Sequence, residues 1–169
     1  MTYIIDVDKI NQTENAYPSP LVSKDTGLPL GTQCAALVQG ATPAAGSSNP
    51  PKQSTWRPGL WVHGTQQGVI KRGTVIATFL NNIYPLTSPQ HTAVYLSHDG
   101  NGITVIDQWE GPTGHAPGNH RPLTFRGSAN RSVDNGDLYY VVELTTLPGQ
   151  GGPCSAVEGS TGVNEQTLQ

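Results

Sequence analysis

The sequence predicts an α+β domain in which one helix near the N-terminus packs on an antiparallel sheet of successive strands. One helix-favouring segment precedes four segments with the β-branched, apolar pattern of strands. The 20 glycines and 14 prolines, a fifth of the 169 residues, argue against long helices. The length fits a single domain, which we place at residues 1–147, followed by a polar, glycine-rich tail at 148–169.

The predicted helix lies in residues 31–39, with the sequence Gly-Thr-Gln-Cys-Ala-Ala-Leu-Val-Gln. Thr32 is a suitable N-cap, and the alanines and leucine that follow favour a helix. Gly40 and the Pro-, Ala-, Gly- and Ser-rich residues 42–51 are expected to end the helix and form a surface loop. Cys34 therefore falls in the first turn of the helix.

Four segments of β-branched and apolar residues predict strands at 74–79, 91–96, 102–107 and 138–144. The polar turn at 97–101 joins the second segment to the third, which indicates a hairpin. Strands that follow one another in this way predict an antiparallel meander.

Charge and hydropathy argue against two classes of partner. The net charge of −3 offers no basic surface for nucleic acid. No apolar run approaches the ~18 residues that a membrane-spanning helix needs. The first residues lack the basic and apolar regions of a conventional signal peptide, so we expect synthesis in the cytoplasm without Sec-dependent export.

The chemistry of Cys34 follows from its place in the predicted helix. Free backbone N–H groups and the helix dipole favour negative charge in the first turn, so they stabilise a thiolate and lower the pKa of the thiol. Cysteine hydrolases use such a thiolate as the attacking group, and the same N–H groups can later hold the oxyanion. An inert core cysteine is the competing interpretation, because free cysteine is among the most buried residue types.

His91 begins the second predicted strand, at the edge of the core, where a general base could reach the thiol. Pairing this strand with residues 103–108 across the turn places His91 opposite either Asp107 or Gln108, and directly opposed side chains share a face. Asp107 would orient the imidazole and stabilise its cation, whereas Gln108 could only orient it. We expect Asp107 as the partner, although a register slip of one residue would exchange the two.

These segments resemble the CHAP and NlpC-type peptidases, which are papain-like enzymes that cut bacterial peptidoglycan. Residues 31–39 are similar to the nucleophile helix of these enzymes, and residues 71–79 to the strand that follows, with Thr74 where the family often has an aspartate. Residues 91–96 resemble the strand of the catalytic histidine, and residues 103–109 the strand of the acidic third member. The order of the segments is that of the family, over about residues 30–110.

The resemblance implies a papain-like fold with Cys34 as nucleophile, His91 as base and Asp107 as orienting acid. Gln33, just before the nucleophile, is a weaker candidate for the oxyanion hole. Gln108 and Trp109 are weaker candidates for substrate binding, with Trp109 at a position that is often polar in CHAP enzymes. Neither a metal nor an organic cofactor is implied.

One branch is most similar to this chain, namely the small amidase effectors of bacterial type VI secretion. The resemblance rests on the single-domain length and on the lack of a signal peptide and of a wall-binding module. It implies cleavage of amide bonds in peptidoglycan stem peptides, within the periplasm of a target cell. A cognate immunity protein and a secretion carrier are the implied partners, and the catalytic domain of a phage-type endolysin is the neighbouring alternative.

Two further alternatives depend on other residues. A disulfide between Cys34 and Cys154 would indicate a secreted binding module instead of an enzyme. A metal site would need clustered histidines, but neither His-x-His nor His-Glu-x-x-His spacing occurs. We expect other places for the remaining histidines: His98 with Asp99 in the hairpin turn, His63 beside Trp61, and His115 and His120 in a solvated loop or along a substrate groove.

Overall fold

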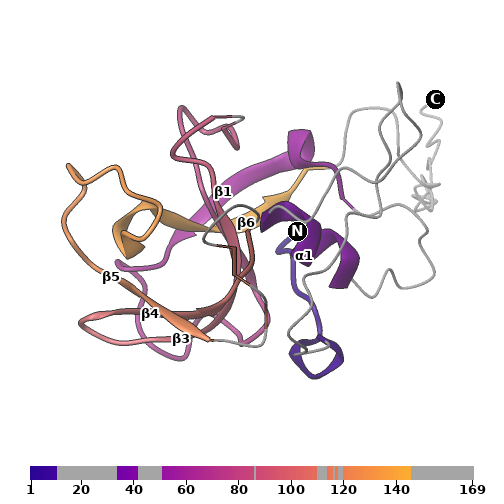
Figure 1. Cartoon of the computed structure of the whole chain (residues 1–169), viewed down its shortest axis with the longest axis horizontal. Helices are drawn as coiled ribbons and strands as arrows, with labels where there is room; N and C mark the ends of the chain where they lie inside the picture. Colours follow the sequence, from indigo (N-terminus) through magenta and orange to yellow (C-terminus); the bar gives the residue numbers. More distant parts are fainter. Residues whose placement is uncertain are drawn as a thin grey trace, which may run out of the picture.

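The computed structural model of the chain describes residues 1–10, 34–41, 51–85, 87–109, 114–115, 117 and 120–145, and the structural statements below refer to these residues. They form one α-helix packed on a six-stranded antiparallel sheet, so the predicted α+β class is confirmed (Figure 1). No helix in these residues is long and apolar enough to cross a membrane. The predicted tail at 148–169 lies outside the described residues.

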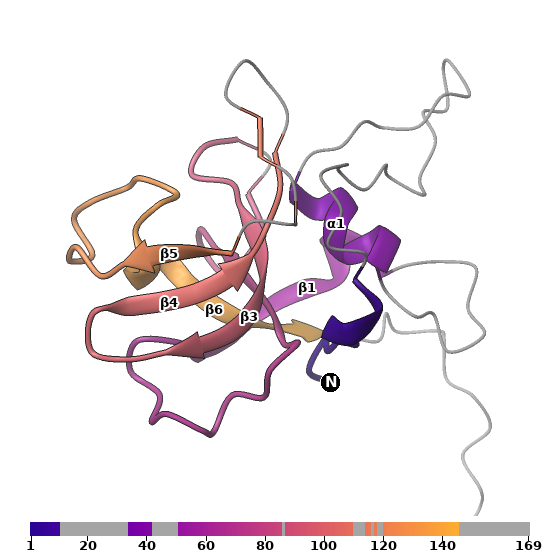
Figure 2. The ribbon, with the colours of Figure 1, turned by 60° about the horizontal axis from the view of Figure 1, so that its bottom comes forward.

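The sheet has the strand order β1-β6-β2-β3-β4-β5. Figure 2 shows β3, β4 and β5 side by side. Its strands are β1 (Trp56–Trp61), β2 (Val75–Thr78), β3 (Thr92–His98), β4 (Gly102–Ile106), β5 (Arg121–Thr124) and β6 (Tyr139–Leu144). The four predicted strands correspond to β2, β3, β4 and β6. β2, β3 and β4 pair in the expected order, but the unpredicted β5 follows them, and β6, the expected last strand of the meander, lies between β1 and β2. The reason is burial on both faces, because Val141 packs in one core and Val142 in the other.

The sequence patterns missed the two strands at the edges of the sheet. β1 contains Pro58 and β5 contains Pro122, and proline removes a hydrogen-bond donor from a strand. An edge strand tolerates this loss, because one of its sides has no neighbour. Trp56 at the start of β1 is fully buried, whereas Trp61 at its end is exposed.

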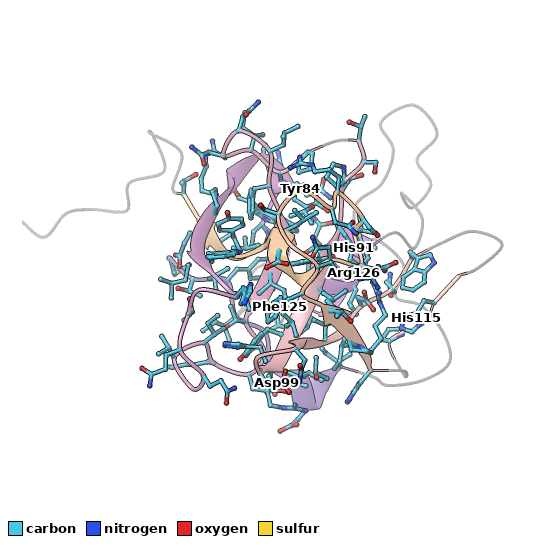
Figure 3. All side chains as sticks on the ribbon, turned by 90° about the vertical axis from the view of Figure 1, so that its left-hand side faces the viewer. Tyr84, His91, Asp99, His115, Phe125 and Arg126 are labelled. Carbon is cyan, nitrogen blue, oxygen red and sulfur yellow. The ribbon has the colours of Figure 1, made fainter. Side chains whose placement is uncertain are left out.

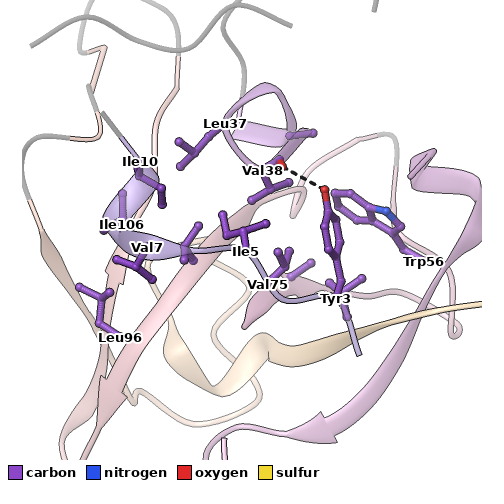
Figure 4. Packing of buried hydrophobic residues seen from close by; sticks show 14 of the residues in the cluster. Tyr3, Ile5, Val7, Ile10, Leu37, Val38, Trp56, Val75, Leu96 and Ile106 are labelled. Carbon is purple, nitrogen blue, oxygen red and sulfur yellow. Dashed lines mark hydrogen bonds between the residues drawn. The ribbon is translucent and has the colours of Figure 1, made fainter. Parts of the chain in front are cut away.

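The helix α1 (Cys34–Ala41) packs on one face of the sheet, beside the N-terminal segment (Figure 4). The Tyr3 hydroxyl donates a hydrogen bond to the Val38 carbonyl over 2.9 Å and joins the two segments. Gly40 and residues 42–51 were expected to end the helix, and α1 includes Gly40 and ends one residue later, at Ala41. The expected cap, Thr32, lies outside the described residues.

The N-terminal segment stays close to the sheet because of a glycine. The Ile5 N–H donates to the Gly73 carbonyl over 3.0 Å, and Gly73 has a φ of 92°. A Cβ at Gly73 would lie 2.3 Å from the Ile5 carbonyl oxygen, so a larger residue would displace the segment. Three short 3₁₀ turns complete the described elements, η1 (Val7–Lys9), η2 (Gln53–Thr55) and η3 (Gly136–Leu138).

The opposite face of the sheet has its own core. This core contains Tyr95, Val105, Leu123 and Tyr139 from four strands, together with Val62. The sheet is thus covered on both faces, with α1 on one face only. This arrangement places the start of α1 near the beginning of β3, where the candidate site lies.

Candidate active site

Cys34 is the first residue of α1, in the first helical turn as predicted. It is 7% exposed, its thiol is free, and its Sγ lies 3.6 Å from the Tyr84 hydroxyl oxygen. The disulfide that a binding module would need at this residue is therefore not present. Cys154, the expected partner in that alternative, lies outside the described residues.

His91 directly precedes β3 and is fixed through its backbone to β2. Its N–H donates to the Thr78 hydroxyl over 3.0 Å, and its carbonyl accepts from the Thr78 N–H over 3.0 Å. Both His91 and Tyr84 belong to the connection between β2 and β3 (Figure 3). The imidazole is held at the start of a buried strand and has little freedom to move.

The imidazole is hydrogen-bonded to a buried carboxylate. His91 Nε2 lies 2.7 Å from Asp107 Oδ2, and the two side chains are 5% and 0% exposed. Because Nε2 faces Asp107, Nδ1 is the ring nitrogen left for the thiol of Cys34. The structure thus brings together the three residues for which the sequence predicted catalytic roles.

The pairing that brings His91 to Asp107 differs from the predicted one. Val94 faces Ile106, and the register shifts by one residue between Tyr95 and Ser97. Extending this pairing would place Ala93 opposite Asp107, so His91 and Asp107 meet diagonally and are not directly opposed. Residues two apart on a strand share a face, which is why the offset still lets the side chains meet. The expectation of directly opposed residues was wrong because β3 continues to His98, which pairs with Ile103, so the turn comes later in the chain than predicted and the register differs.

The electrostatics favour a thiolate and an imidazolium. Burial raises the pKa of Cys34, but hydrogen bonding and charge from His91, with smaller effects from Tyr84 and the Thr92 backbone, outweigh it and lower the pKa. Burial lowers the pKa of His91, but hydrogen bonds to Asp107 and Cys34 outweigh it and raise the pKa to about 9. At neutral pH, proton transfer from sulfur to imidazole is therefore favoured.

Asp107 has a second cationic partner in Arg121, the first residue of β5. Arg121 Nε donates to Asp107 Oδ2 over 2.8 Å, and Nη2 lies 2.8 Å from the same oxygen. Burial raises the pKa of Asp107, yet the hydrogen bonds from His91 and Arg121 outweigh it and lower the pKa. The carboxylate is consequently ionised when His91 carries its proton.

Sequence reasoning missed Tyr84 and Arg121. Tyr84 is buried beside Trp56, with ring centroids 5.0 Å apart, and its hydroxyl faces the sulfur. Burial and the neighbouring Cys34 raise the pKa of Tyr84 well above its ordinary value, so the hydroxyl stays protonated and can donate. One signal could have led to Arg121. A buried carboxylate such as Asp107 needs a cationic partner, and the chain has only nine lysines and arginines to provide one.

The three weaker candidates lie in different environments. Gln108 is fully buried, so it has no surface to offer a substrate. Trp109 is half-buried, its ring lies 6.2 Å from that of His91, and it stacks on His115 with centroids 4.5 Å apart. Gln33 lies outside the described residues.

The other histidines differ from expectation in two cases. His98 is a buried residue of β3, between the Tyr95 hydroxyl at 2.7 Å and the Thr65 carbonyl at 2.8 Å, because the strand runs past the predicted turn. His115 is not a solvated residue, because it stacks on Trp109 and its side chain is only 16% exposed. His63 lies beside Trp61 as expected, His120 is exposed, and Asp99 forms the expected turn. Among the described residues, no group of three potential ligands could hold a metal ion.

A buried thiol at a helix start and a histidine hydrogen-bonded to a buried carboxylate, on an antiparallel sheet, are the geometry of a cysteine hydrolase. The chain belongs to the family described as domesticated amidase effector 2, whose sequence model matches residues 5–142. The match confirms the predicted resemblance to type VI amidase effectors at the level of the family.

Two relatives support this assignment. The chain is 35% identical over 99 residues to the type VI secretion amidase effector 2 protein of Salmonella typhi. The aligned region covers 53% of this chain and 73% of that protein. A solved structure of type 6 secretion amidase effector 2 (Tae2) superposes with a TM-score of 0.59 at 25% identity. The superposition covers 84% of this chain and 95% of that one.

Proposed function

We propose that the protein is a cysteine amidase that hydrolyses an amide bond in the peptide part of bacterial peptidoglycan. One observation carries the proposal, namely the free, buried thiol of Cys34 beside the His91–Asp107 pair in a chain that belongs to an amidase effector family. We place the fold with the papain-like CHAP and NlpC-type enzymes, on the order of its helix and strands.

The mechanism begins with Cys34 as thiolate and His91 as imidazolium. The sulfur attacks the carbonyl carbon, and the backbone N–H groups at the start of α1 hold the oxyanion. Collapse of this intermediate breaks the C–N bond, and His91 gives its proton to the leaving amine. Water then attacks the thioester and gives a proton to His91, and the C–S bond breaks to restore the Cys34 thiolate beside the His91 imidazolium.

Asp107 and the neighbours of the thiol have supporting roles. Asp107 keeps the His91 ring in one orientation and stabilises the imidazolium. Tyr84 can donate to the thiolate, and Gln33 remains a candidate oxyanion donor. Trp109 and His115, which stack on each other beside the pair, are candidates for contact with the peptide.

We further propose that the protein acts as an antibacterial toxin in the periplasm of a target cell after type VI delivery. The named relatives support this role. A cognate immunity protein that covers the site and a carrier of the secretion machine are the proposed partners.

The test is digestion of purified sacculi, with separation and mass analysis of the released muropeptides. We expect the natural protein to convert the peptides to fragments that carry a new amine and a new carboxylate. Cys34→Ala should keep the fold and lose hydrolysis by about 10⁴-fold or more. Cys154→Ala is the matched control and should remain active, whereas activity in folded Cys34→Ala would contradict the proposal.

A further inference from the structure

Arg121 joins the buried carboxylate of the site to the surface of the protein. Its Nε and Nη2 both lie 2.8 Å from Asp107 Oδ2, and its Nη1 donates to Asp134 Oδ1 over 2.7 Å. The side chains are 0% exposed for Asp107, 17% for Arg121 and 50% for Asp134. The guanidinium is therefore held between two carboxylates, one inside the protein and one at its surface.

Trp109 further restricts the guanidinium. The Arg121 Cζ lies 4.9 Å from the centre of the Trp109 ring, within the range of a cation–π contact. A planar guanidinium that is fixed on three sides cannot turn away from Asp107 without losing several contacts.

Asp107 needs this partner for a physical reason. A fully buried carboxylate takes up a proton unless opposite charges surround it. His91 provides such a charge only when it is protonated, and in the proposed mechanism it gives that proton away. Arg121 keeps its charge throughout.

We propose that Arg121 is a positioning residue, which keeps Asp107 ionised and aimed at His91 while the proton moves between His91, the sulfur and the substrate. The assignment of Cys34 as nucleophile rests on the proposed function. The role of Arg121 in the electrostatics of the site does not, so it can be tested without peptidoglycan.

Other groups also face Asp107 and must be separated from Arg121. His115, which stacks on Trp109, has its Nε2 3.5 Å from Asp107 Oδ1. Tyr139, the first residue of β6, also lies near Asp107. Its hydroxyl donates to the Val133 carbonyl over 2.6 Å. Burial raises the pKa of Tyr139 well above the ordinary value, so this side chain stays neutral. His115 is thus the neighbour that needs its own control variant.

The experiment measures the rate of Cys34 alkylation by iodoacetamide against pH, in the full chain. Peptide mass analysis counts the label on Cys34 separately from that on Cys154. In the natural protein, the imidazolium should give Cys34 a reactive plateau that extends well below the ordinary pKa of a thiol. In Arg121→Gln, Asp107 should take up a proton at higher pH, which weakens the thiolate–imidazolium pair.

We expect the acid edge of the plateau to move up by about 1 pH unit or more in Arg121→Gln. Arg121→Lys keeps the charge, so its acid edge should lie close to that of the natural protein, with a lower rate of Cys34 alkylation on the plateau. Asp134→Asn removes the carboxylate charge on one side of the guanidinium and should shift the acid edge in the same direction by a smaller amount. This variant tests the proposal even if Arg121→Gln does not fold.

Arg126→Gln and His115→Gln are the controls. Arg126 is an exposed residue close to Arg121 in the chain, so its replacement removes the same charge without touching Asp107. Both controls should leave the acid edge in place. An unchanged edge in Arg121→Gln, an equal shift in Arg121→Lys, or an equal shift in either control would overturn the proposal.

Discussion

Two histidine–aspartate pairs among the described residues, His91–Asp107 and His63–Asp137, differ in the burial of the histidine and in the groups beside them. His91 and Asp107 are both buried, and the cysteine among the described residues lies beside them. In the second pair, His63 Nδ1 contacts Oδ1 of the buried Asp137, and the His63 side chain is 41% exposed.

The second pair is tied to a turn instead of a nucleophile. Asp137 accepts the N–H groups of Arg126 and Gly127 over 2.8 and 2.7 Å, and His63 stacks on Phe125 with centroids 3.8 Å apart. These contacts hold the chain after β5 against η3. The comparison teaches that an imidazole and a carboxylate become a candidate catalytic pair only when the imidazole is buried beside a thiol with which it can exchange a proton.

The largest contrast is expected between the two histidines. His91→Ala should lower sacculus hydrolysis by about 10⁴-fold or more, because the thiolate loses its counter-ion and the leaving amine its proton donor. His63→Ala should leave the rate within a few-fold and lower the melting temperature, because Asp137 loses a partner and Phe125 a stacked ring. Rates and thermal unfolding of both variants check this, and a similar loss of activity in the two would remove the distinction between the pairs.

The two aspartates should separate in the same way with smaller effects. Asp107→Asn keeps the shape of the side chain but removes the charge that stabilises the imidazolium, so kcat should fall by roughly 10² to 10⁴. Asp137→Asn should leave kcat unchanged and lower the free energy of unfolding by about 1–3 kcal/mol, through weaker bonds to two backbone N–H groups. Urea unfolding and turnover on one substrate give both quantities, and the reverse ranking would show that the His63–Asp137 pair serves catalysis.

The pH profile of kcat/KM tests the charge states of the first pair. His91 must be protonated in the reactive state, and its pKa is raised to about 9, so activity should hold up to that pH and fall about tenfold per unit above it. The pKa of Cys34 is lowered, so the acid edge of the plateau should lie below the ordinary pKa of a thiol. Asp107→Asn should move the alkaline limb to lower pH, whereas Asp137→Asn should not move it. An alkaline limb that stays in place in Asp107→Asn would separate Asp107 from His91.

The smallest effect is expected at Tyr84. Tyr84→Phe removes a hydroxyl 3.6 Å from the sulfur, which should raise the pKa of Cys34 and slow hydrolysis by a few-fold. Tyr95→Phe is the matched control, because its hydroxyl faces His98 on the other side of the sheet. Equal effects in the two variants would mean that loss of a buried hydroxyl, and not contact with the thiol, causes the change.

Much of this architecture could be predicted from local patterns. The helix with Cys34 in its first turn and the strands β2, β3, β4 and β6 follow from periodicity and from the composition of the turns. The placement of β6 depends on which faces other elements cover, and the strands β1 and β5 carry prolines that hide them. Neither feature can be read from a window of neighbouring residues.

The candidate site was predictable to the same extent. Cys34, His91 and Asp107 each sit at the end of a recognisable element, so their order along the chain indicates their meeting. Tyr84 and Arg121 lie in a connection and in an edge strand, and only the tertiary fold brings them to the site. The diagonal meeting of His91 with Asp107 depends on a register shift that the hairpin pattern does not encode.

The central claim is that the Cys34 sulfur is the nucleophile, and partial alkylation tests it most directly. Samples treated with iodoacetamide for increasing times are assayed on sacculi, and mass analysis gives the labelled fraction of Cys34 and of Cys154 in each. The account predicts that activity falls in proportion to the label on Cys34 and reaches zero when that residue is fully modified, whatever the label on Cys154. Activity that persists after complete alkylation of Cys34 would contradict it.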